Sequence, residues 1–338
     1  MSAGPLRIGI AGLGFGGGVH LPVFSAMDDV EICVVMGRTR EKAAAGAARC
    51  GGAVACTTIE EFLDRPLDAV VIAVPPGPAG QLAAAALERG VAVLAEKPIA
   101  GCAAEAEVLA DRSRDRITAV DFEFRELESF KALHALVHGG ALGRIREVNI
   151  SWRGLSYAQA RQAWSWKTDA EAGGGVLTLS GLHVFNLLEW LFGPVTVTGV
   201  RLFDDATRAF APPGRRPAAD TADLVFRTAE DAAIHAHLSN AARDRHGHRW
   251  EIDAEAGQVV IDDGGVGSFG GFTMSLKTGD GYRELARDPD REGDYRIGPV
   301  GALAERFLQG VRRNTAVRPA FDEGARAQVI QERVYAIA

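Results

Sequence analysis

The stretch "LRIGIAGLGFGGGVHLPVF" (residues 6–24) decides the fold of the first part of the chain. An apolar run over residues 6–11 predicts a β-strand. A glycine-rich turn follows this strand, and the residues after the turn have a pattern typical of a helix. Gly12, Gly14 and Gly17 fit the spacing G-x-G-x-x-G. In a strand–turn–helix unit the first glycine permits a tight turn, the second lets the backbone approach a pyrophosphate, and the third allows close helix–strand packing. The stretch therefore predicts a dinucleotide-binding turn.

The same β-then-α alternation continues along the chain. Apolar strands are predicted at 30–36, 69–74, 91–95 and 117–125, and helices near 41–49, 79–90 and 104–115. Repeated β-α-β-α units are typical of a doubly wound parallel sheet, the Rossmann arrangement of an α/β protein. Ligands of such sheets bind beyond the carboxyl ends of the strands. We therefore expect residues 1–121 to form a dinucleotide-binding domain.

The end of the second predicted strand favours one cofactor. NAD enzymes usually place Asp or Glu there to bind the ribose 2′-hydroxyl. This chain has Gly37 followed by Arg38, Thr39 and Arg40, so guanidinium groups are available for a 2′-phosphate. The residues predicted to bind the cofactor are Gly12, Gly14, Phe15, Gly16, Gly17, Arg38, Thr39, Arg40, Val74, Pro75, Pro76, Glu96 and Lys97. We expect NADP(H), with NAD(H) as the alternative.

Two charged residues end the strand in "VAVLAEKPIA" (91–100). Charged groups at the end of a buried strand are costly unless they are paired or used. Glu96 and Lys97 fall at the edge of the sheet where the nicotinamide should lie. We therefore expect Lys97 to lie beside the nicotinamide.

A different pattern begins after residue 121. Stretches at 146–154, 195–203, 221–228, 232–240 and 249–264 alternate apolar and polar residues between turns. This alternation indicates an antiparallel sheet with one covered face. The chain is thus predicted to have a second, α+β domain over 122–338.

A glycine-led apolar helix, "GGGVLTLSGLHVFNLLEWLFG" (173–193), is the most informative part of this second half. Leu179, His183 and Asn186 would share one face of a regular helix. Taken alone, such a histidine is more often a hydrogen-bonded core residue than a functional one.

These features together resemble the glucose–fructose oxidoreductase / inositol dehydrogenase (Gfo/Idh/MocA) oxidoreductases. The resemblance rests on "GLGFGGGVHLP" (12–22), "AVVIAVPP" (69–76), "EKPIA" (96–100), the 173–193 helix and "PAFDEGARAQVIQE" (319–332). It implies a Rossmann domain followed by an α+β domain with a large, mostly antiparallel sheet, often used for oligomer contacts. It also implies that Lys97 is catalytic and that His183 contacts substrate or assists proton transfer. The family commonly has an aspartate four residues before this histidine, where this chain has Leu179, which cannot titrate.

The working hypothesis is hydride transfer to or from a secondary alcohol or ketone of a sugar, cyclitol or related polyol. The expected catalytic residues are Lys97 and His183, and the expected substrate-binding residues are Lys97, Arg125, Tyr157, Trp166, Lys167, His183 and Asn186. Two alternatives remain open: a dinucleotide-binding regulator or scaffold without turnover, and an NAD(P)-assisted glycosidase or aldose–aldose oxidoreductase.

The composition of the chain limits the classes of partner that we expect it to bind. The net charge of −7 argues against nucleic acid as the main partner, because phosphate binding needs a basic surface. No apolar run approaches the ~20 residues of a membrane span, and the start of the chain lacks the apolar core of a signal peptide. The four histidines at 235, 237, 246 and 248 lack accompanying ligands at a metal-binding spacing, so we expect no metal. We expect a cytoplasmic protein that forms a homodimer or homotetramer through the C-terminal sheet.

Overall fold

The structure, a computed structural model, describes residues 4–244, 246–265, 271–279, 281–289 and 293–338. The chain divides into two compact units. The first comprises Met1–Glu123 and Arg296–Gln328, and the second comprises Phe124–Tyr295 and Val329–Ala338. The sequence predicts one division, at 121/122, whereas the structure groups a later segment, Arg296–Gln328, with the first unit.

The first unit contains a six-stranded parallel sheet in the order β3-β2-β1-β4-β5-β6. Its strands are β1 (Leu6–Ala11), β2 (Val30–Met36), β3 (Val54–Cys56), β4 (Ala69–Ile72), β5 (Ala92–Ala95) and β6 (Thr118–Val120). All six carboxyl ends face one edge, and the doubly wound prediction is confirmed. The last strand was expected over 117–125 but ends at Val120 and is followed by a 3₁₀ turn, Glu123–Glu126.

The first unit also contains helices and helical turns. They are a π-helical turn η1 (Gly16–His20), α1 (Leu21–Ser25), α2 (Arg40–Ala47), a 3₁₀ turn η2 (Ala48–Cys50), α3 (Ile59–Leu63), α4 (Pro76–Glu88), α5 (Ala103–Arg112) and α10 (Ile297–Arg313). The helix α11 (Phe321–Ile337) begins in this unit, and its last turns are counted with the second.

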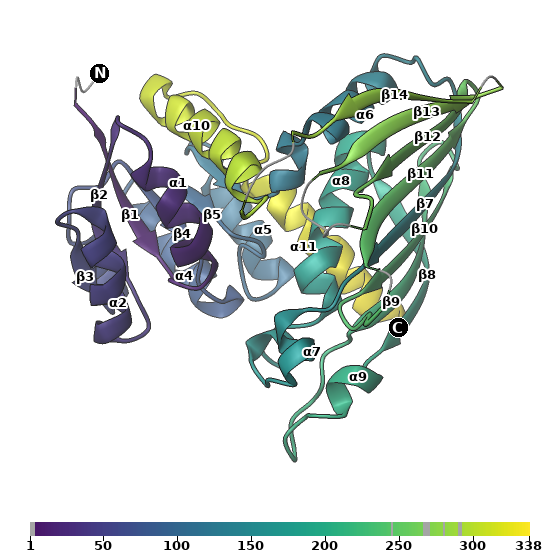
Figure 1. Ribbon diagram of the computed structural model, residues 1–338. Coiled ribbons are helices and arrows are strands. Elements are labelled where there is room, and N and C mark those ends of the chain that lie inside the picture. The colour runs from purple at the N-terminus through teal and green to yellow at the C-terminus, as the bar shows by residue number, and fades with distance from the viewer. Residues whose placement is uncertain (1–3, 245, 266–270, 280, 290–292) are drawn as a thin grey trace. The chain divides into compact units, whose positions relative to one another are not determined.

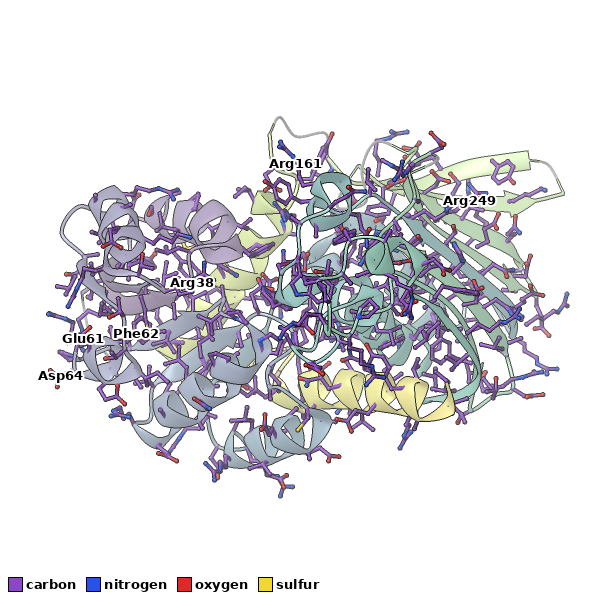
Figure 2. The ribbon with its side chains drawn as sticks, turned by 90° about the horizontal axis from the view of Figure 1, so that it is seen from below. Arg38, Glu61, Phe62, Asp64, Arg161 and Arg249 are labelled. Atoms are coloured by element: carbon purple, nitrogen blue, oxygen red, sulfur yellow. The ribbon has the colours of Figure 1, made fainter. Side chains whose placement is uncertain are left out.

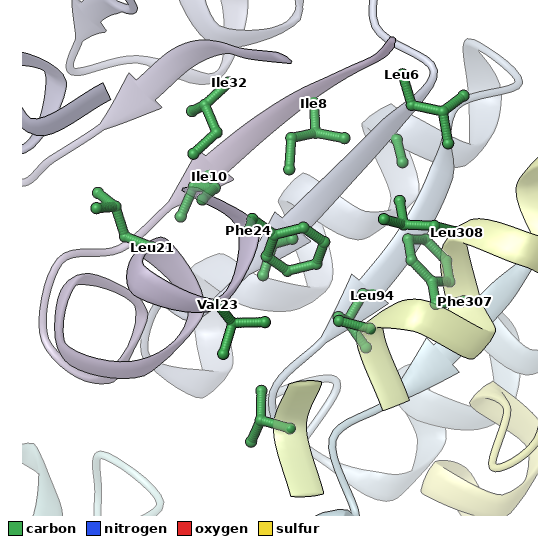
Figure 3. Packing of buried hydrophobic residues seen from close by; sticks show 14 of the residues in the cluster. Leu6, Ile8, Ile10, Leu21, Val23, Phe24, Ile32, Leu94, Phe307 and Leu308 are labelled. Atoms are coloured by element: carbon green, nitrogen blue, oxygen red, sulfur yellow. The ribbon is translucent and has the colours of Figure 1, made fainter. Parts of the chain in front are cut away.

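Helix α10 explains why a late segment belongs to the first unit. It packs beside α1 and β5 (Figure 1). Phe307 and Leu308 lie in one hydrophobic cluster with Phe24 of α1 and Leu94 of β5 (Figure 3). Burying an aromatic or leucine side chain stabilises a fold by about 1.5–3 kcal/mol. The helix therefore completes the core of the nucleotide-binding unit.

The second unit is built on an eight-stranded sheet in the order β14-β13-β12-β11-β7-β10-β9-β8. Its strands are β7 (Ile145–Arg153), β8 (Val195–Phe203), β9 (Thr221–Thr228), β10 (Ala233–Ser239), β11 (Gly247–Ala254), β12 (Gly257–Asp262), β13 (Thr273–Thr278) and β14 (Gly281–Arg287). Every neighbouring pair is antiparallel except β7 and β10, which are parallel. The expectation of a large, mostly antiparallel sheet is confirmed.

One face of this sheet is covered, as the alternation predicted. Along β7, Val148, Ile150 and Trp152 are buried, while the side chains between them are partly exposed. The helices of this unit are α6 (Glu128–His138), α7 (Tyr157–Arg161), η4 (Trp166–Thr168), η5 (Leu177–Gly181), α8 (Leu182–Phe192) and α9 (Asp205–Arg208). Helix α6 contacts β13, β14 and α8. Of the helices in the described ranges, none combines the length and apolar character needed to cross a membrane.

Candidate active site

The glycine turn after β1 is fixed by steric contact with the loop after β4. Gly12 has φ +96°, and a Cβ there would lie 2.2 Å from the carbonyl oxygen of Ala73. Gly16 is also close, since its Cβ would lie 3.0 Å from the Cβ of Ala73. A Cβ on Gly17 would make only ordinary contact with Leu13. Of these two glycines, Gly16 is therefore the one that packs closely against the loop after β4.

Gly14 differs from its neighbours in having an open face. A Cβ added there would have no heavy atom of the described residues within 4 Å. Glycine at an exposed position of this turn leaves room for a ligand to approach the backbone. The donor-rich helix start and this open face suit a pyrophosphate.

The loop after β4 is shaped by prolines. Pro75 is the N-cap of α4 and Pro76 its first residue, a position where a fixed φ favours helix initiation. Val74 precedes them and is half-buried. These three residues of the cofactor prediction thus hold the backbone that Gly12 packs against.

The three residues expected at the ribose differ in their contacts. Arg38 is exposed at the end of β2 (Figure 2). Thr39 caps α2, since its hydroxyl accepts a hydrogen bond from the amide of Lys42. Arg40 donates to the carbonyl oxygen of Ala55 at 3.0 Å and lies 3.5 Å from a carboxylate oxygen of Glu61. Arg38 is thus the better-placed of the two arginines for a ligand.

The carboxyl ends of β5 and β6 bring charged side chains together. The amide of Glu96 donates to Ile72 of β4, and the amide of Asp121 donates to Ala95 of β5. The Nε2 atom of His20, at the end of η1, lies 2.9 Å from Oε1 of Glu96 and 3.4 Å from Oδ2 of Asp121. His20 and Asp121 are fully buried, and the Glu96 side chain is 16% exposed. Lys97 directly follows Glu96 and is half-buried.

Burial shifts the protonation of this group. It raises the pKa of Glu96 to about 7, an effect that the Glu123 charge reinforces and Lys97 opposes. It raises the pKa of Glu123 to about 8, with the Asp121 charge adding and Lys97 opposing. Burial and the Glu96 charge raise the pKa of Asp121 well above its usual range. Burial lowers the pKa of His20 despite the nearby Asp121 charge.

The sequence analysis missed three members of this group: His20, Asp121 and Glu123. The signal was present in "AVDFEFR" (119–125), where two carboxylates follow a buried strand whose end shares an edge with Glu96. Ligand atoms of His20, Glu96 and Asp121 lie within 4.8 Å of one another, so in the described part of the chain they form a donor set that could surround a metal ion. Metal binding would require these carboxyls to lose the protons that burial favours.

In the second unit, His183 lies on α8 among aromatic rings. It is buried, and its ring centroid is 5.1 Å from that of Phe124 and 6.0 Å from that of Trp152. The helix was expected to be regular, but residues 177–181 form a π-helical turn. The face shared by Leu179 and His183 therefore departs from regular α-helical spacing.

Two predicted substrate residues contact each other. The Nε atom of Arg125 donates to Oδ1 of Asn186 at 2.8 Å, and both side chains are buried. The Arg125 guanidinium also lies 5.2 Å from the ring centroid of Trp190. This cation–π contact and hydrogen bond hold the guanidinium in place.

The other substrate candidates lie in different surroundings. Trp166 and Lys167 belong to the turn η4, and the Lys167 ammonium is 5.9 Å from the Trp166 ring centroid. A Cβ on Gly174 would lie 2.3 Å from the carbonyl oxygen of Trp166, so this glycine packs directly on the turn. Tyr157 is 75% exposed and lies near Arg161 on α7.

Three of the four histidines of 235–248 have separate partners among the described residues. His237 Nδ1 lies 2.7 Å from a carboxylate oxygen of Asp223, and His246 Nε2 lies 3.0 Å from the carbonyl oxygen of Ala242. The Nε2 atom of His248 accepts a hydrogen bond of 2.8 Å from Trp250 Nε1. Its ring is fully buried and stacked on Trp152. An imidazole nitrogen that accepts this bond is not available to a metal.

Comparison with known proteins decides the family. Residues 6–122 match the model of an oxidoreductase family with an NAD-binding Rossmann fold, and residues 130–260 match that of the GFO/IDH/MocA C-terminal domain. The chain belongs to the Gfo/Idh/MocA family of oxidoreductases. As a member of this family, the chain is an NAD-binding oxidoreductase.

Similar Gfo/Idh/MocA proteins cover nearly the whole chain. An uncharacterized oxidoreductase of Synechocystis sp. is 28% identical over 97% of this chain and 92% of its own length. Inositol 2-dehydrogenase of Streptomyces avermitilis is 27% identical over 97% of this chain and 90% of its own length. Among solved structures, levoglucosan dehydrogenase in complex with NADH and levoglucosan superposes with a TM-score of 0.86 at 21% identity, covering 99% of this chain and 97% of that one. This last likeness shows that the fold is shared.

Proposed function

We propose that this protein transfers hydride between a nicotinamide cofactor and a secondary alcohol or ketone carbon of a sugar, cyclitol or related polyol. The observation that carries the proposal is within the first unit: an amine, Lys97, follows β5 at the sheet edge that also bears the glycine turn. In doubly wound sheets this edge binds the dinucleotide. Relatives named inositol 2-dehydrogenase and levoglucosan dehydrogenase support the substrate class.

We propose NADP(H) as the preferred cofactor, with NAD(H) as the alternative. The support is the exposed Arg38 after β2, where the segment 37–40 contains no carboxylate. A guanidinium can bind a 2′-phosphate through paired hydrogen bonds. The bound cofactor supplies the hydride chemistry, and the protein binds it, orients it and moves a proton.

We propose that Lys97 donates or accepts the proton that accompanies hydride transfer. In reduction its ammonium protonates the carbonyl oxygen of the substrate, and in oxidation its neutral amine accepts the hydroxyl proton. His183 is proposed to hydrogen-bond the reacting oxygen, with Arg125, Asn186, Trp166 and Lys167 binding the rest of the substrate. Tyr157 is the weakest member of this set, because it lies on the surface of its own unit.

A second candidate function is a dinucleotide-binding regulator or scaffold without turnover. The observation that favours it is Leu179, a side chain that can neither titrate nor accept a hydrogen bond, four residues before His183. The intact Glu96–Lys97–Pro98 segment favours the enzyme.

The experiment that separates these functions uses the full chain with each cofactor and a panel of keto-sugars, inositols and other polyols. Nicotinamide absorbance is followed for turnover, and cofactor fluorescence for binding. Turnover of any panel member supports the enzyme. Tight cofactor binding with no turnover across the panel supports the regulator, and cofactor that stays bound through purification while sugars are interconverted supports an aldose–aldose oxidoreductase.

We also propose assembly into a homodimer or homotetramer through the second unit's sheet. Its partly exposed face carries polar side chains such as Asn149, His237 and Arg249. Light scattering of the purified chain measures the assembly state, and a monomer at micromolar concentration would contradict this proposal.

A further inference from the structure

Arg296, the residue before α10, lies beside the glycine turn of the first unit. Its guanidinium carbon is 4.9 Å from the centroid of the Phe15 ring, and Phe15 directly follows Gly14 in the chain. Gly14 is the position whose open face leaves room for a pyrophosphate. A cation from a distant segment of the sequence is thus held next to the expected phosphate site.

Helix α10 fixes the position of Arg296. The carbonyl oxygen of Arg296 accepts a hydrogen bond of 3.0 Å from the amide of Val300, and Val300 is fully buried in the hydrophobic core of the first unit. Ile297 and Phe15 both pack against this same core cluster. Because its backbone is anchored in this way, Arg296 loses less conformational freedom when it binds a ligand than an arginine of a mobile loop would.

The contact with Phe15 suits a guanidinium that also binds an anion. A cation–π contact acts through the charge of the cation, so it is compatible with hydrogen bonds from the same guanidinium, which has five N–H donors. Arg49 is the second arginine at this turn, and it is used differently, because its Nη1 donates to the carbonyl oxygen of Gly17 at 2.8 Å. Arg296 is therefore the better candidate for a phosphate.

Arg296 also acts on two carboxyls at the edge of the parallel sheet. Burial raises the pKa of Glu96 and of Glu123, and the Arg296 charge opposes this rise in both. A guanidinium can interact with more than one anion through its fork of donors. Charge balance for these carboxyls is thus a purely structural role for Arg296, which the experiments below distinguish from ligand binding.

We propose that Arg296 binds the pyrophosphate of the nicotinamide cofactor, and that Phe15 holds its guanidinium beside the glycine turn. This inference rests on the proposed function and adds to it a cofactor contact from the late segment of the first unit. Guanidinium groups form paired, charge-assisted hydrogen bonds with phosphate oxygens. Since NAD(H) and NADP(H) share the pyrophosphate, Arg296 contributes to the affinity for both, whereas Arg38 is proposed to distinguish them.

Calorimetric titration of the full chain tests the contact with NADH, NADPH and ADP-ribose, which keeps the pyrophosphate and lacks the nicotinamide. Arg296→Met retains an unbranched side chain against Phe15 and should weaken all three ligands by similar factors of about tenfold or more. Arg312→Met is the matched control on the same helix, since the Arg312 guanidinium is paired with Asp29 at 2.7 Å. It loses the same charge and should change the affinities by less than about twofold.

Three outcomes of this titration would overturn the inference. One is an unchanged ADP-ribose affinity in Arg296→Met, which would place the arginine away from the pyrophosphate. Another is a loss confined to NADPH, which would assign the arginine to the 2′-phosphate. The third is an equal loss in Arg312→Met, which would show an effect of net charge alone.

Double variants separate phosphate binding from the structural role. If Arg296 only balances the carboxyls, adding Glu123→Gln to Arg296→Met should restore the wild-type affinity for ADP-ribose, and this result would overturn the inference. We expect the double variant to remain weak. Phe15→Leu should also weaken ADP-ribose, but it should add little in the Arg296→Met background, because the ring acts through the guanidinium. Additive losses would contradict the role of Phe15.

Turnover distinguishes this inference from the proposed function. If the panel of sugars and polyols identifies a substrate, Arg296→Met should raise the KM for the cofactor about tenfold, while kcat at saturating cofactor changes less than about twofold. Arg296-dependent binding of ADP-ribose without turnover of any panel member contradicts the proposed function alone. Turnover with the same cofactor KM in wild type and Arg296→Met contradicts the inference alone.

Discussion

The guanidinium of Arg125 and the amide of Asn186 form one buried structural pair in the second unit. Nε of Arg125 donates to Oδ1 of Asn186 at 2.8 Å, and the ring of Trp190 lies beside the guanidinium. The sequence predicts both residues as substrate contacts, and the structure shows that they bond to each other. Since the amide oxygen faces Arg125, Asn186 sets the orientation of the cation.

The first prediction concerns the stability of this pair. Asn186→Ala leaves a buried, charged donor without its acceptor and should lower the free energy of unfolding by about 1.5–3 kcal/mol. Urea denaturation measures the change. Asn186→Asp, which restores an acceptor, should recover most of the loss. Equal stability of wild type and Asn186→Ala would show that the bond contributes nothing.

Substitutions in the glycine turn should affect thermal stability and cofactor affinity separately. Gly12→Ala places a methyl group 2.2 Å from a backbone oxygen and should lower the melting temperature by several degrees. Gly14→Ala meets no protein atom within 4 Å, so it should melt as wild type does while cofactor affinity falls at least tenfold. Gly18→Ala, also without such contacts, is the matched control for both measurements. Full cofactor affinity in Gly14→Ala would show that the pyrophosphate does not bind beside Gly14.

Cofactor choice depends on Arg38. Arg38→Ala should weaken NADP(H) binding about tenfold or more and change NAD(H) binding little, because only the 2′-phosphate requires a guanidinium. Calorimetric titration with both cofactors measures the two affinities. Arg40→Ala is the control, since this side chain is held by Ala55 and Glu61. Parallel losses for the two cofactors in Arg38→Ala would refute the proposed NADP(H) preference.

Stability should fall as pH rises through the range of the buried carboxyls. Burial raises the pKa of Glu96 from 4.5 to about 7, so the folded state binds this proton more tightly than the unfolded state. The stability that this proton contributes is complete below about pH 4 and is lost as pH rises through about 7, with a total of about 3 kcal/mol. Thermal melts at several pH values should therefore show a steeper decline in wild type than in Glu96→Gln. Parallel curves would contradict the assignment.

Much of the fold could be predicted from sequence, because local pattern and burial agree. The strands at 6–11 and 30–36 lie where the apolar runs placed them, and the alternating stretches of the second half form its sheet. Helix α10 falls within the predicted second domain, because a sequence pattern can indicate that a helix covers a core but not which core it covers. The parallel pairing of β7 and β10 likewise depends on long-range topology.

The candidate site was only partly predictable for the same reason. Motifs with fixed local geometry, such as the glycine turn and the lysine after β5, were identified from their spacing. His20 was missed because nothing local marks a histidine of the first helical turn as the partner of Glu96, 76 residues later. Asp121 was missed because the strand was expected to continue past Val120. Because β6 ends at Val120, the carboxylates that follow it lie at the edge of the sheet.

The central claim is that Lys97 transfers the proton in a nicotinamide-linked oxidation or reduction. The most direct measurement is the rate of cofactor oxidation or reduction by wild type and Lys97→Met with the best substrate of the polyol and keto-sugar panel, alongside the cofactor affinity of both proteins. The account predicts that Lys97→Met binds cofactor as wild type does and loses at least a hundredfold in kcat. Equal kcat values in the two proteins would contradict it.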